Sequence, residues 1–283
     1  MNKNKTIIIF LFKILPKSLL SRLFGYLTRI PLPTKCMTKL TDWYIKKFEI
    51  TMNGYEIPAG GFKNFDMFFT RSLKAGARKI DSSKGSIISP VDARVDQFGK
   101  ITKYKIMQAK GISYSLKDLL PSDSAKLFEN GNFAVLYLSP ADYHRIHSPV
   151  NGKINGFFHI PGKLFTVQEF MVNGLPGLFS INERLISYIK TPKGSIAVCK
   201  IGAMNVGRIT LSYADIITNK FRRSQKEVLF DKNSEIKVKA GEEIGMFHLG
   251  STIVLLFEKG MASLDAIKKG DKVRLGQRIG HFL

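Results

Sequence analysis

The strongest constraint on the fold is a change of pattern beyond Ile80, where short apolar runs alternate with glycine, proline, asparagine and aspartate. The runs are rich in β-branched and aromatic residues, which is typical of strands separated by tight turns. They read SIISPVDARV, NFAVLYLSP, GSIAVCKIGA, GRITLSY and STIVLLF. Because helical patterns precede them, the sequence predicts an α+β protein in which N-terminal helices are followed by a β-rich, sandwich- or barrel-like domain.

The last of these runs carries a serine at its start. Residues 253–257, IVLLF, form an unbroken apolar run that ends at Glu258 and Gly260, and they predict a buried strand. Ser251 follows Gly250 shortly before this run. Most Gly-Ser pairs only form a turn, but a serine at the mouth of a rigid strand is also well placed to react.

The first 50 residues have a different character, with cations among bulky apolar side chains. The apolar run 7–12 is broken by Lys13 and falls far short of the ~20 residues that a membrane span needs. After Pro16, apolar residues recur at helical spacing, which predicts a helix that lies in a membrane interface with its cations toward anionic headgroups. The apolar residues are Leu19, Leu20, Leu23, Phe24 and Leu27, and the cations between them are Lys17, Arg22 and Arg29.

Two alternatives remain for this segment. Lysines before a short apolar core also begin signal peptides, although no small-residue cleavage site follows here. A helix that packs on its own domain is the second alternative.

The helical pattern continues toward the β-rich part of the chain. A second helical stretch ends near Thr51, and a short helix follows with Asn64 as its expected N-cap. We therefore expect an amphipathic, helical membrane-associating segment over residues 1–50 and the second domain over residues 51–283.

Charge and cysteine content limit the partners. The formal charge of +22 implies attraction to polyanions, either nucleic acid or an anionic membrane surface. The lysines and arginines are spread along the chain without a nucleic-acid-binding motif, so we expect lipid and no nucleic acid. Cys36 and Cys199 lack metal-site spacing and the five histidines are scattered, so we expect reduced thiols and no metal site.

Three separate segments carry residues suited to nucleophilic chemistry. Asp92 lies in SPVDARV, His144 and His147 lie in LSPADYHRIHSPV, and Ser251 precedes the last apolar run. A serine hydroxyl is a weak nucleophile that needs an adjacent base, and the base in turn needs an orienting group. Residue types alone do not decide between this chemistry and ordinary turn capping.

Longer motifs help to decide between nucleophilic chemistry and turn capping. They are FFTRSLKAGAR (68–78), SPVDARV (89–95), AKGISYSLKDLL (109–120), LSPADYHRIHSPVNG (138–152), PGKLFTV (161–167), NERLISYI (182–189), IGAMNVGRI (201–209) and GEEIGMFHLGST (241–252). Together they resemble the bacterial, self-processing, pyruvoyl-dependent phosphatidylserine decarboxylase family over nearly the whole chain. The Leu-Gly-Ser-Thr step is specific only in the context of the other motifs.

The resemblance implies that the second domain is catalytic and cuts itself between Gly250 and Ser251. The products would be a β chain of residues 1–250 and an α chain of residues 251–283. Ser251 would attack the carbonyl of Gly250, and β-elimination would then leave a pyruvoyl group at position 251. That covalent cofactor would form a Schiff base with the amine of phosphatidylserine and serve as the electron sink for decarboxylation.

The same resemblance assigns roles to the remaining candidates. His147 is the expected base for self-cleavage, with Asp92 holding its imidazole in the right tautomer. His144 is the expected proton donor after CO2 leaves, and Tyr143 adjoins both histidines. His248 is expected to be a local strand residue.

The function implied is that of a carboxy-lyase of phospholipid biosynthesis, which converts phosphatidylserine to phosphatidylethanolamine and CO2. We expect it to attach peripherally to the cytoplasmic face of the inner membrane. Its own β and α chains would form a heterodimer, with a higher oligomer as an open alternative. A non-enzymatic lipid-binding protein with the same fold is the alternative function.

Overall fold

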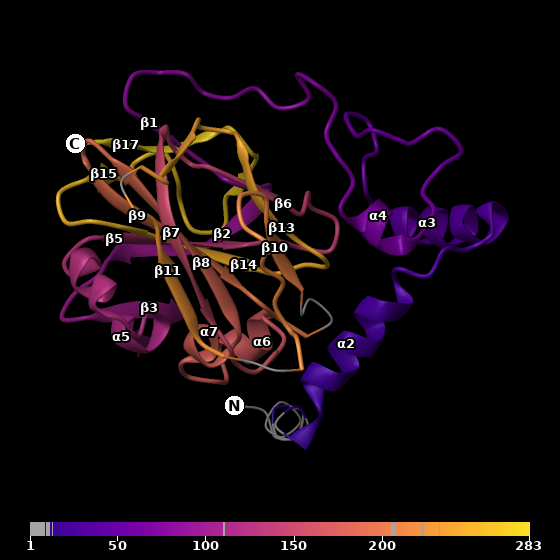
Figure 1. The fold of residues 1–283 in the computed structure, drawn as a ribbon, viewed down its shortest axis with the longest axis horizontal. Helices are drawn as coiled ribbons and strands as arrows, with labels where there is room; N and C mark the ends of the chain where they lie inside the picture. The colour runs from indigo at the N-terminus through magenta and orange to yellow at the C-terminus, as the bar shows by residue number, and fades with distance from the viewer. Residues whose placement is uncertain are drawn as a thin grey trace.

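The fold comes from a computed structural model, which describes residues 9, 12, 14–109, 111–204, 208–221, 224–231 and 233–283. Most of the predicted apolar run 7–12, and Lys13 after it, lie outside the described residues. The strands form one body, and three helices from the N-terminal part of the chain stand along one side of it (Figure 1). A long connection leads from these helices across the top of the view into the strands.

One large antiparallel sheet dominates the β-rich body. Its nine strands follow the order β11-β7-β8-β9-β14-β5-β2-β16, with β12 pairing with β7 beside this path. The sheet is open, because its path ends at β11 and β16 rather than returning on itself. The strands are β2 (Ala93–Lys100), β5 (Asn132–Tyr137), β7 (Gly152–Ile160), β8 (Arg184–Thr191), β9 (Gly194–Ile201), β11 (Lys226–Leu229), β12 (Ile236–Val238), β14 (Thr252–Phe257) and β16 (Lys272–Val273).

The predicted buried strand at 253–257 is confirmed and lies in the interior of this sheet. Every residue of β14 is buried, because β9 and β5 pair with its two edges and apolar side chains cover both faces. In the register of these pairs, Thr252 lies between Tyr137 and Ile201. A strand that is buried on both faces favours the continuous apolar run seen in the sequence.

Smaller sheets complete the β-rich part. Two three-stranded sheets have the orders β1-β17-β15 and β10-β13-β6, and β3 pairs with β4. The strands are β1 (Ser86–Ile88), β17 (Arg278–Phe282), β15 (Ala262–Ser263), β10 (Ile209–Leu211), β13 (Glu243–Phe247), β6 (Arg145–His147), β3 (Lys105–Ala109) and β4 (Ile112–Ser115). The β-rich character of the predicted α+β fold is therefore confirmed.

The helices are few, and their caps follow local sequence signals. Asn64 caps α4 as predicted, since its side-chain oxygen accepts a hydrogen bond from the backbone N–H of Met67 at 2.9 Å. The α-helices are α2 (Lys17–Leu27), α3 (Thr34–Phe48), α4 (Phe65–Phe69), α5 (Leu116–Leu119), α6 (Glu169–Val172) and α7 (Leu178–Ile181), and η1 (Asp123–Phe128) is a 3-10 helix. Both cysteines are free, as predicted, with Cys36 exposed and Cys199 buried.

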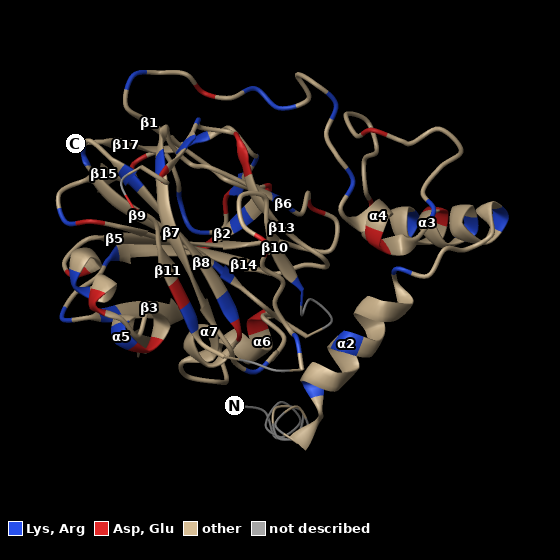
Figure 2. Ribbon diagram, in the orientation of Figure 1, with Lys and Arg blue, Asp and Glu red and all other residues tan. Residues whose placement is uncertain are grey.

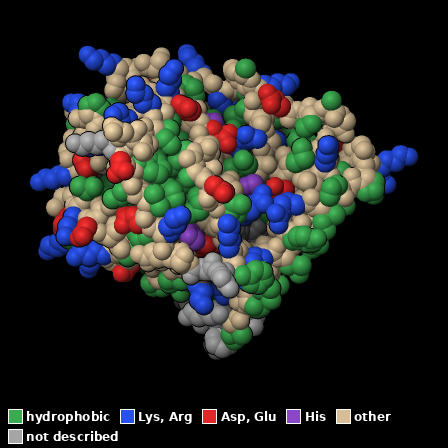
Figure 3. Space-filling view, in the orientation of Figure 1, with side chains coloured by type: hydrophobic (Ala, Val, Ile, Leu, Met, Phe, Trp, Pro, Cys, Tyr) green, Lys and Arg blue, Asp and Glu red, His purple; other side chains and the backbone are tan. Residues whose placement is uncertain are grey.

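Helix α2 is amphipathic, but it buries polar side chains and exposes apolar ones. The side chains of Lys17 and Ser21 are buried against the rest of the chain. Leu19, Leu23 and Leu27 recur every four residues on the other side, and they are 53%, 54% and 52% exposed. A helix that used its apolar stripe to pack on its own domain would bury those leucines instead. Figure 3 shows hydrophobic side chains along the edge of the molecule where α2 and α3 lie.

None of the helices in the described part of the chain combines the length and the apolar character needed to cross a bilayer. Lysine and arginine are distributed over the helices and the sheets alike, as Figure 2 shows.

Candidate functional site

Ser251 is placed by the central strand of the large sheet. It immediately precedes β14, and its carbonyl accepts a hydrogen bond from the backbone N–H of Leu138 at 2.8 Å, which extends the ladder between β14 and β5. The residue is fully buried, and its Oγ has no hydrogen-bond partner among the described residues. A buried hydroxyl without a partner is costly, by about 1–3 kcal/mol, and is therefore expected where it serves a purpose.

The backbone just before Ser251 is strained. Leu249 has a φ of 112°, in the region that non-glycine residues rarely occupy. Gly250 follows, and a Cβ there would lie 3.1 Å from Nε2 of His144 and 3.4 Å from the carbonyl oxygen of Leu138. Glycine suits this close approach, because a side chain at position 250 would press on the histidine ring.

His144 faces the Gly250 backbone with an open ring nitrogen. Its Nδ1 donates to the carbonyl of Asp142 at 2.8 Å, which leaves Nε2 as the acceptor of the neutral ring, and Nε2 has no partner among the described residues. The ring is fully buried and packs on Phe69, with 4.1 Å between ring centroids. Burial, together with the charge of Arg71, lowers the pKa of His144 to about 3. The imidazole is therefore neutral at physiological pH.

His147 lies at the end of β6, and both of its ring nitrogens are engaged. Nδ1 donates to the carbonyl of Gly241 at 2.7 Å, and Nε2 accepts from the hydroxyl of Tyr143 at 3.1 Å. Burial lowers the pKa of His147, but the bond to Gly241 and the negative charges of Glu243 and Asp92 oppose that shift. Negative charges therefore act on His147, whereas the charge that acts on His144 is the positive charge of Arg71.

Asp92 lies near His147 without a direct hydrogen bond between the two in the described structure. Its carboxylate accepts from Nε of Arg78 at 3.1 Å and from the backbone N–H of Leu275 at 2.8 Å. The carbonyl of Gly241, rather than Asp92, accepts the Nδ1 proton of His147. Asp92 therefore acts on His147 through its charge, while its position is fixed by Arg78 and Leu275.

His248 does more than occupy a strand end. It follows β13, and its Nδ1 lies 3.0 Å from Oδ1 of Asp66, on α4. Arg208 donates to Oδ2 of the same carboxylate at 3.0 Å. These contacts connect the loop before Ser251 to the helical part of the chain.

Sequence reasoning missed two arginines that shape the site. Arg71 is almost fully buried, with its guanidinium over the ring of Tyr55 and one donor on the carbonyl of Ala141. Arg78 holds Asp92. Both lie in the motif FFTRSLKAGAR, and for Arg71 the available signal was an arginine one residue after a run of aromatic residues.

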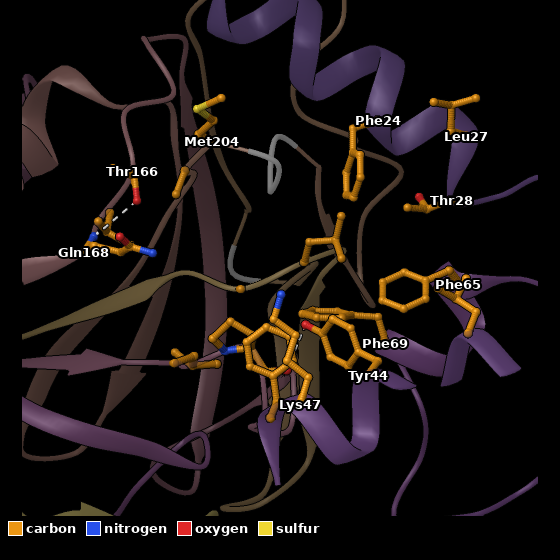
Figure 4. A pocket seen from close by; sticks show the side chains of 18 of the residues that line it. Phe24, Leu27, Thr28, Tyr44, Lys47, Phe65, Phe69, Thr166, Gln168 and Met204 are labelled. Atoms are coloured by element: carbon orange, nitrogen blue, oxygen red, sulfur yellow. Dashed lines mark hydrogen bonds between the residues drawn. The ribbon is translucent and has the colours of Figure 1, made fainter. Parts of the chain in front are cut away.

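An apolar cavity of about 800 Å³ opens beside Leu249 and Gly250, a size typical of small-molecule sites. Leu249 and Gly250 line one part of it, and the exposed side chains of Leu27 and Trp43 line another. Figure 4 shows Phe24 of α2 on one side of the cavity, Tyr44 and Phe69 on another, and Thr166 and Gln168 opposite. The cavity therefore reaches from the exposed apolar surface of the helices to the backbone before Ser251.

The arrangement is suited to an acyl shift within the chain. A buried hydroxyl adjoins a strained backbone whose next carbonyl belongs to a glycine, and the neutral imidazole of His144 lies beside that glycine. A pyruvoyl group made from Ser251 would fit at this position. Ser251 is buried, its Oγ has no hydrogen-bond partner among the described residues, and the preceding Gly250 lines the apolar cavity. Over the described ranges, the His, Cys, Asp and Glu side chains form no group of three that could hold a metal ion.

Comparison with known proteins identifies a family of closely similar sequences. The profile of the family described as phosphatidylserine decarboxylase matches residues 65–281. The chain is 39% identical over 272 residues to the phosphatidylserine decarboxylase proenzyme of Myxococcus xanthus, covering 95% of this chain and 96% of that protein. It is 40% identical to the proenzyme of Alcanivorax borkumensis, covering 95% and 94%. It is 37% identical to that of an Anaeromyxobacter strain, covering 98% and 99%.

The lowered pKa of His144 predicts a pH dependence of stability. An imidazole in the unfolded chain takes up a proton near pH 6.5, whereas His144 in the folded chain does so only near pH 3. Between these values the unfolded state binds more protons, so the free energy of unfolding falls as the pH is lowered. His144→Gln removes this contribution, and we expect its stability to fall less than that of the wild type between about pH 7 and about pH 5 in urea titrations.

Identical slopes for the wild type and His144→Gln would contradict this prediction, because they would show that folding does not lower the pKa of His144.

Proposed function

This chain belongs to the phosphatidylserine decarboxylase family, and from that premise we propose that it cuts itself between Gly250 and Ser251 to become active. It is a carboxy-lyase of phospholipid biosynthesis that converts phosphatidylserine to phosphatidylethanolamine and CO2. One observation carries the proposed cut, namely the buried, unpartnered Oγ of Ser251 directly after the strained Leu249–Gly250 backbone. The products are a β chain, residues 1–250, and an α chain, residues 251–283, which stay together as a heterodimer.

The self-cleavage step starts with attack of Oγ of Ser251 on the carbonyl carbon of Gly250. The amide between the two residues becomes an ester, and the serine nitrogen takes up the proton that the hydroxyl loses. β-Elimination then breaks the ester and leaves Gly250 as a free carboxylate. Hydrolysis of the remaining dehydroalanine releases ammonia and leaves a pyruvoyl group at position 251. The positive φ of Leu249 supports this step, because cleavage releases the strain.

We assign His147 as the base for this step. A useful base has a pKa near the working pH, and a pKa of about 3 makes His144 too weak. The charges of Asp92 and Glu243 favour the protonated form of His147, which supports its assignment. In this proposal, Nε2 of His147 gives up its hydrogen bond with the hydroxyl of Tyr143 and accepts the hydroxyl proton of Ser251. The charge of Asp92 stabilises the resulting imidazolium. The proximity of His144 to Gly250 supports the opposite assignment, which mutagenesis can distinguish.

His144 is assigned to the decarboxylation half of the reaction. A pyruvoyl carbonyl at position 251 supplies an electron sink for the charge left on the substrate carbon when CO2 departs. The open Nε2 of His144 faces the same backbone and lies where a proton must be delivered. A substrate carboxylate beside this ring would raise the pKa of His144, so that the ring carries a proton while substrate is bound.

The apolar cavity gives the substrate a route to this site. Diacyl chains remain in a bilayer, so the reacting group has to come to the headgroup. The cavity connects the backbone before Ser251 to the exposed side chains of Leu27 and Trp43, and its walls suit the glycerol backbone and the first methylenes of a phospholipid.

We propose that the chain attaches peripherally to the cytoplasmic face of the inner membrane through its first 50 residues, while residues 51–283 form the catalytic domain. The exposed stripe of Leu19, Leu23 and Leu27 supports this docking surface, because only a second apolar phase would bury it. Arg22 of α2 and the lysines of α3 would attract anionic headgroups.

A non-enzymatic lipid-binding protein with the same fold is the second candidate. The cavity supports lipid binding without chemistry, whereas the strained backbone before a buried serine favours the enzyme. The two candidates differ in whether the chain is cut.

Ser251→Ala should remain a single chain without decarboxylase activity, because no hydroxyl remains to attack Gly250. The wild type should give two masses, corresponding to residues 1–250 and 251–283 with a blocked N-terminus on the smaller chain. Ser263→Ala, in the same C-terminal segment, is the control and should be cut like the wild type. Intact-protein mass spectrometry after folding decides the outcome, and a single uncut wild-type chain would favour the non-enzymatic candidate.

The two histidines should separate the two reactions. His147→Ala and Asp92→Asn should slow self-cleavage by about a hundredfold or more, since each weakens the base. His144→Ala should be cut normally and then release CO2 about a hundredfold more slowly. A time course of chain cleavage, followed by CO2 release from the cleaved protein, measures both steps. Cleavage blocked by His144→Ala and normal in His147→Ala would exchange the two assignments.

Membrane docking should depend on the leucine stripe of α2. The double variant L19S/L23S removes two exposed apolar side chains, and we expect sedimentation with phosphatidylserine-containing vesicles to weaken by at least about tenfold. High salt should weaken wild-type binding without abolishing it, since the apolar contribution is not screened. L127S/L229S changes two exposed leucines outside α2 and α3 and should bind normally. Equal binding by both double variants would move the docking surface away from α2.

A further inference from the structure

A second, basic cavity of about 320 Å³ lies on the other side of α2 from the apolar cavity. Arg22, Gly25, Tyr26 and Arg29 line it, at the i, i+3, i+4 and i+7 spacing that places side chains on one helix face. Phe24, Leu27 and Thr28 of the same helix line the apolar cavity instead. We call the basic cavity the arginine pocket.

Positive charge dominates the arginine pocket. Three arginines line the pocket, namely Arg22 of α2, Arg29 just beyond the end of that helix, and Arg208 of a facing loop. Asp66 is the one carboxylate among the described lining residues, and it is already bonded to Arg208 and His248. One carboxylate therefore faces three guanidinium groups.

The charges of the pocket act on one another. Burial lowers the pKa of Arg208, the charge of Asp66 opposes this shift, and the charge of Arg29 adds to it. Burial also lowers the pKa of His248; the bond to Asp66 and its charge oppose this shift, and Arg208 and Arg29 add to it. An anion near the arginines would reduce the repulsion that remains between these cations.

Two donors in the pocket have no acceptor. Nε of Arg22 and Nε of Arg208 are buried and have no hydrogen-bond partner among the described residues. The guanidinium of Arg22 is held 4.0 Å from the ring centroid of Phe221, which orients its planar fork. A buried donor left unsatisfied costs about 1–3 kcal/mol, so an acceptor-only ligand would be favoured here. Phosphate oxygens match guanidinium donors in geometry as well as in charge.

We propose that the arginine pocket binds a phosphate group, separately from the substrate in the apolar cavity. An anionic phospholipid is the expected source, because α2 carries both Arg22 and the exposed leucine stripe, and Arg29 follows two residues after its end. The same chemistry would also accept free inorganic phosphate. Bound phosphate would tie α2 to the Asp66–His248–Arg208 cluster, and so to the loop three residues before Ser251.

The test compares two double variants that remove equal charge. R22Q/R29Q removes two of the three arginines that line the pocket, whereas K35Q/K39Q removes two exposed lysines of α3 that do not line it. Binding is measured by sedimentation with phosphatidylcholine vesicles, with and without phosphatidylglycerol, and by calorimetric titration with inorganic phosphate. Neither readout requires decarboxylation, so failure of the proposed catalytic function would not affect it.

Phosphatidylglycerol should strengthen wild-type binding by about tenfold or more, and R22Q/R29Q should lose this gain while K35Q/K39Q keeps most of it. Equal losses in the two variants would overturn the proposal, because diffuse surface charge would then explain the gain. Binding of inorganic phosphate that R22Q/R29Q abolishes, with an unchanged phosphatidylglycerol effect, would support the phosphate site and identify a soluble source.

R22K/R29K keeps the charge without the planar fork and controls for folding. It should unfold at the wild-type temperature and bind more weakly than the wild type but more tightly than R22Q/R29Q. Full wild-type binding by R22Q/R29Q in both measurements would also overturn the proposal.

Discussion

The burial of β14 between β9 and β5 is the constraint on which the site depends. Every residue of this strand is enclosed by the sheet and the core, so its register cannot shift without exposing apolar side chains. Ser251 directly precedes the strand, and its carbonyl is tied to Leu138 of the neighbouring chain segment. The position of Ser251 is therefore a consequence of core packing, and a packed core also holds the strained φ of Leu249 against relaxation.

Two histidines three residues apart receive different environments from the same fold. His144 is fully buried among aromatic rings and near the charge of Arg71, which keeps it neutral. His147 keeps carboxylates within electrostatic reach. Such a difference in environment can divide acid and base roles between residues of one type, because each reaction needs a different proton affinity. The division proposed for this chain follows that principle.

Helix α2 carries the features on which the docking and phosphate proposals rest. Lys17 and Ser21 are buried against the rest of the chain, and the leucine stripe is left exposed. Phe24 and Leu27 also line the apolar cavity, and Arg22 and Tyr26 line the arginine pocket. The proposed contacts with a bilayer, a lipid chain and a phosphate would therefore all involve this one helix.

The sequence by itself determined the features that depend on neighbours within a few residues. The strand at 253–257, the α2 helix and the Asn64 cap all follow from periodicity or from a side chain that bonds the next turn. The family motifs also singled out Ser251 and the two histidines. Only the tertiary structure decided that Gly241 accepts from His147, that Leu275 and Arg78 hold Asp92, and that His248 meets Asp66. Most of these contacts join residues far apart in the chain, up to 183 positions for Asp92 and Leu275, and no local pattern encodes which distant strands and loops pack together.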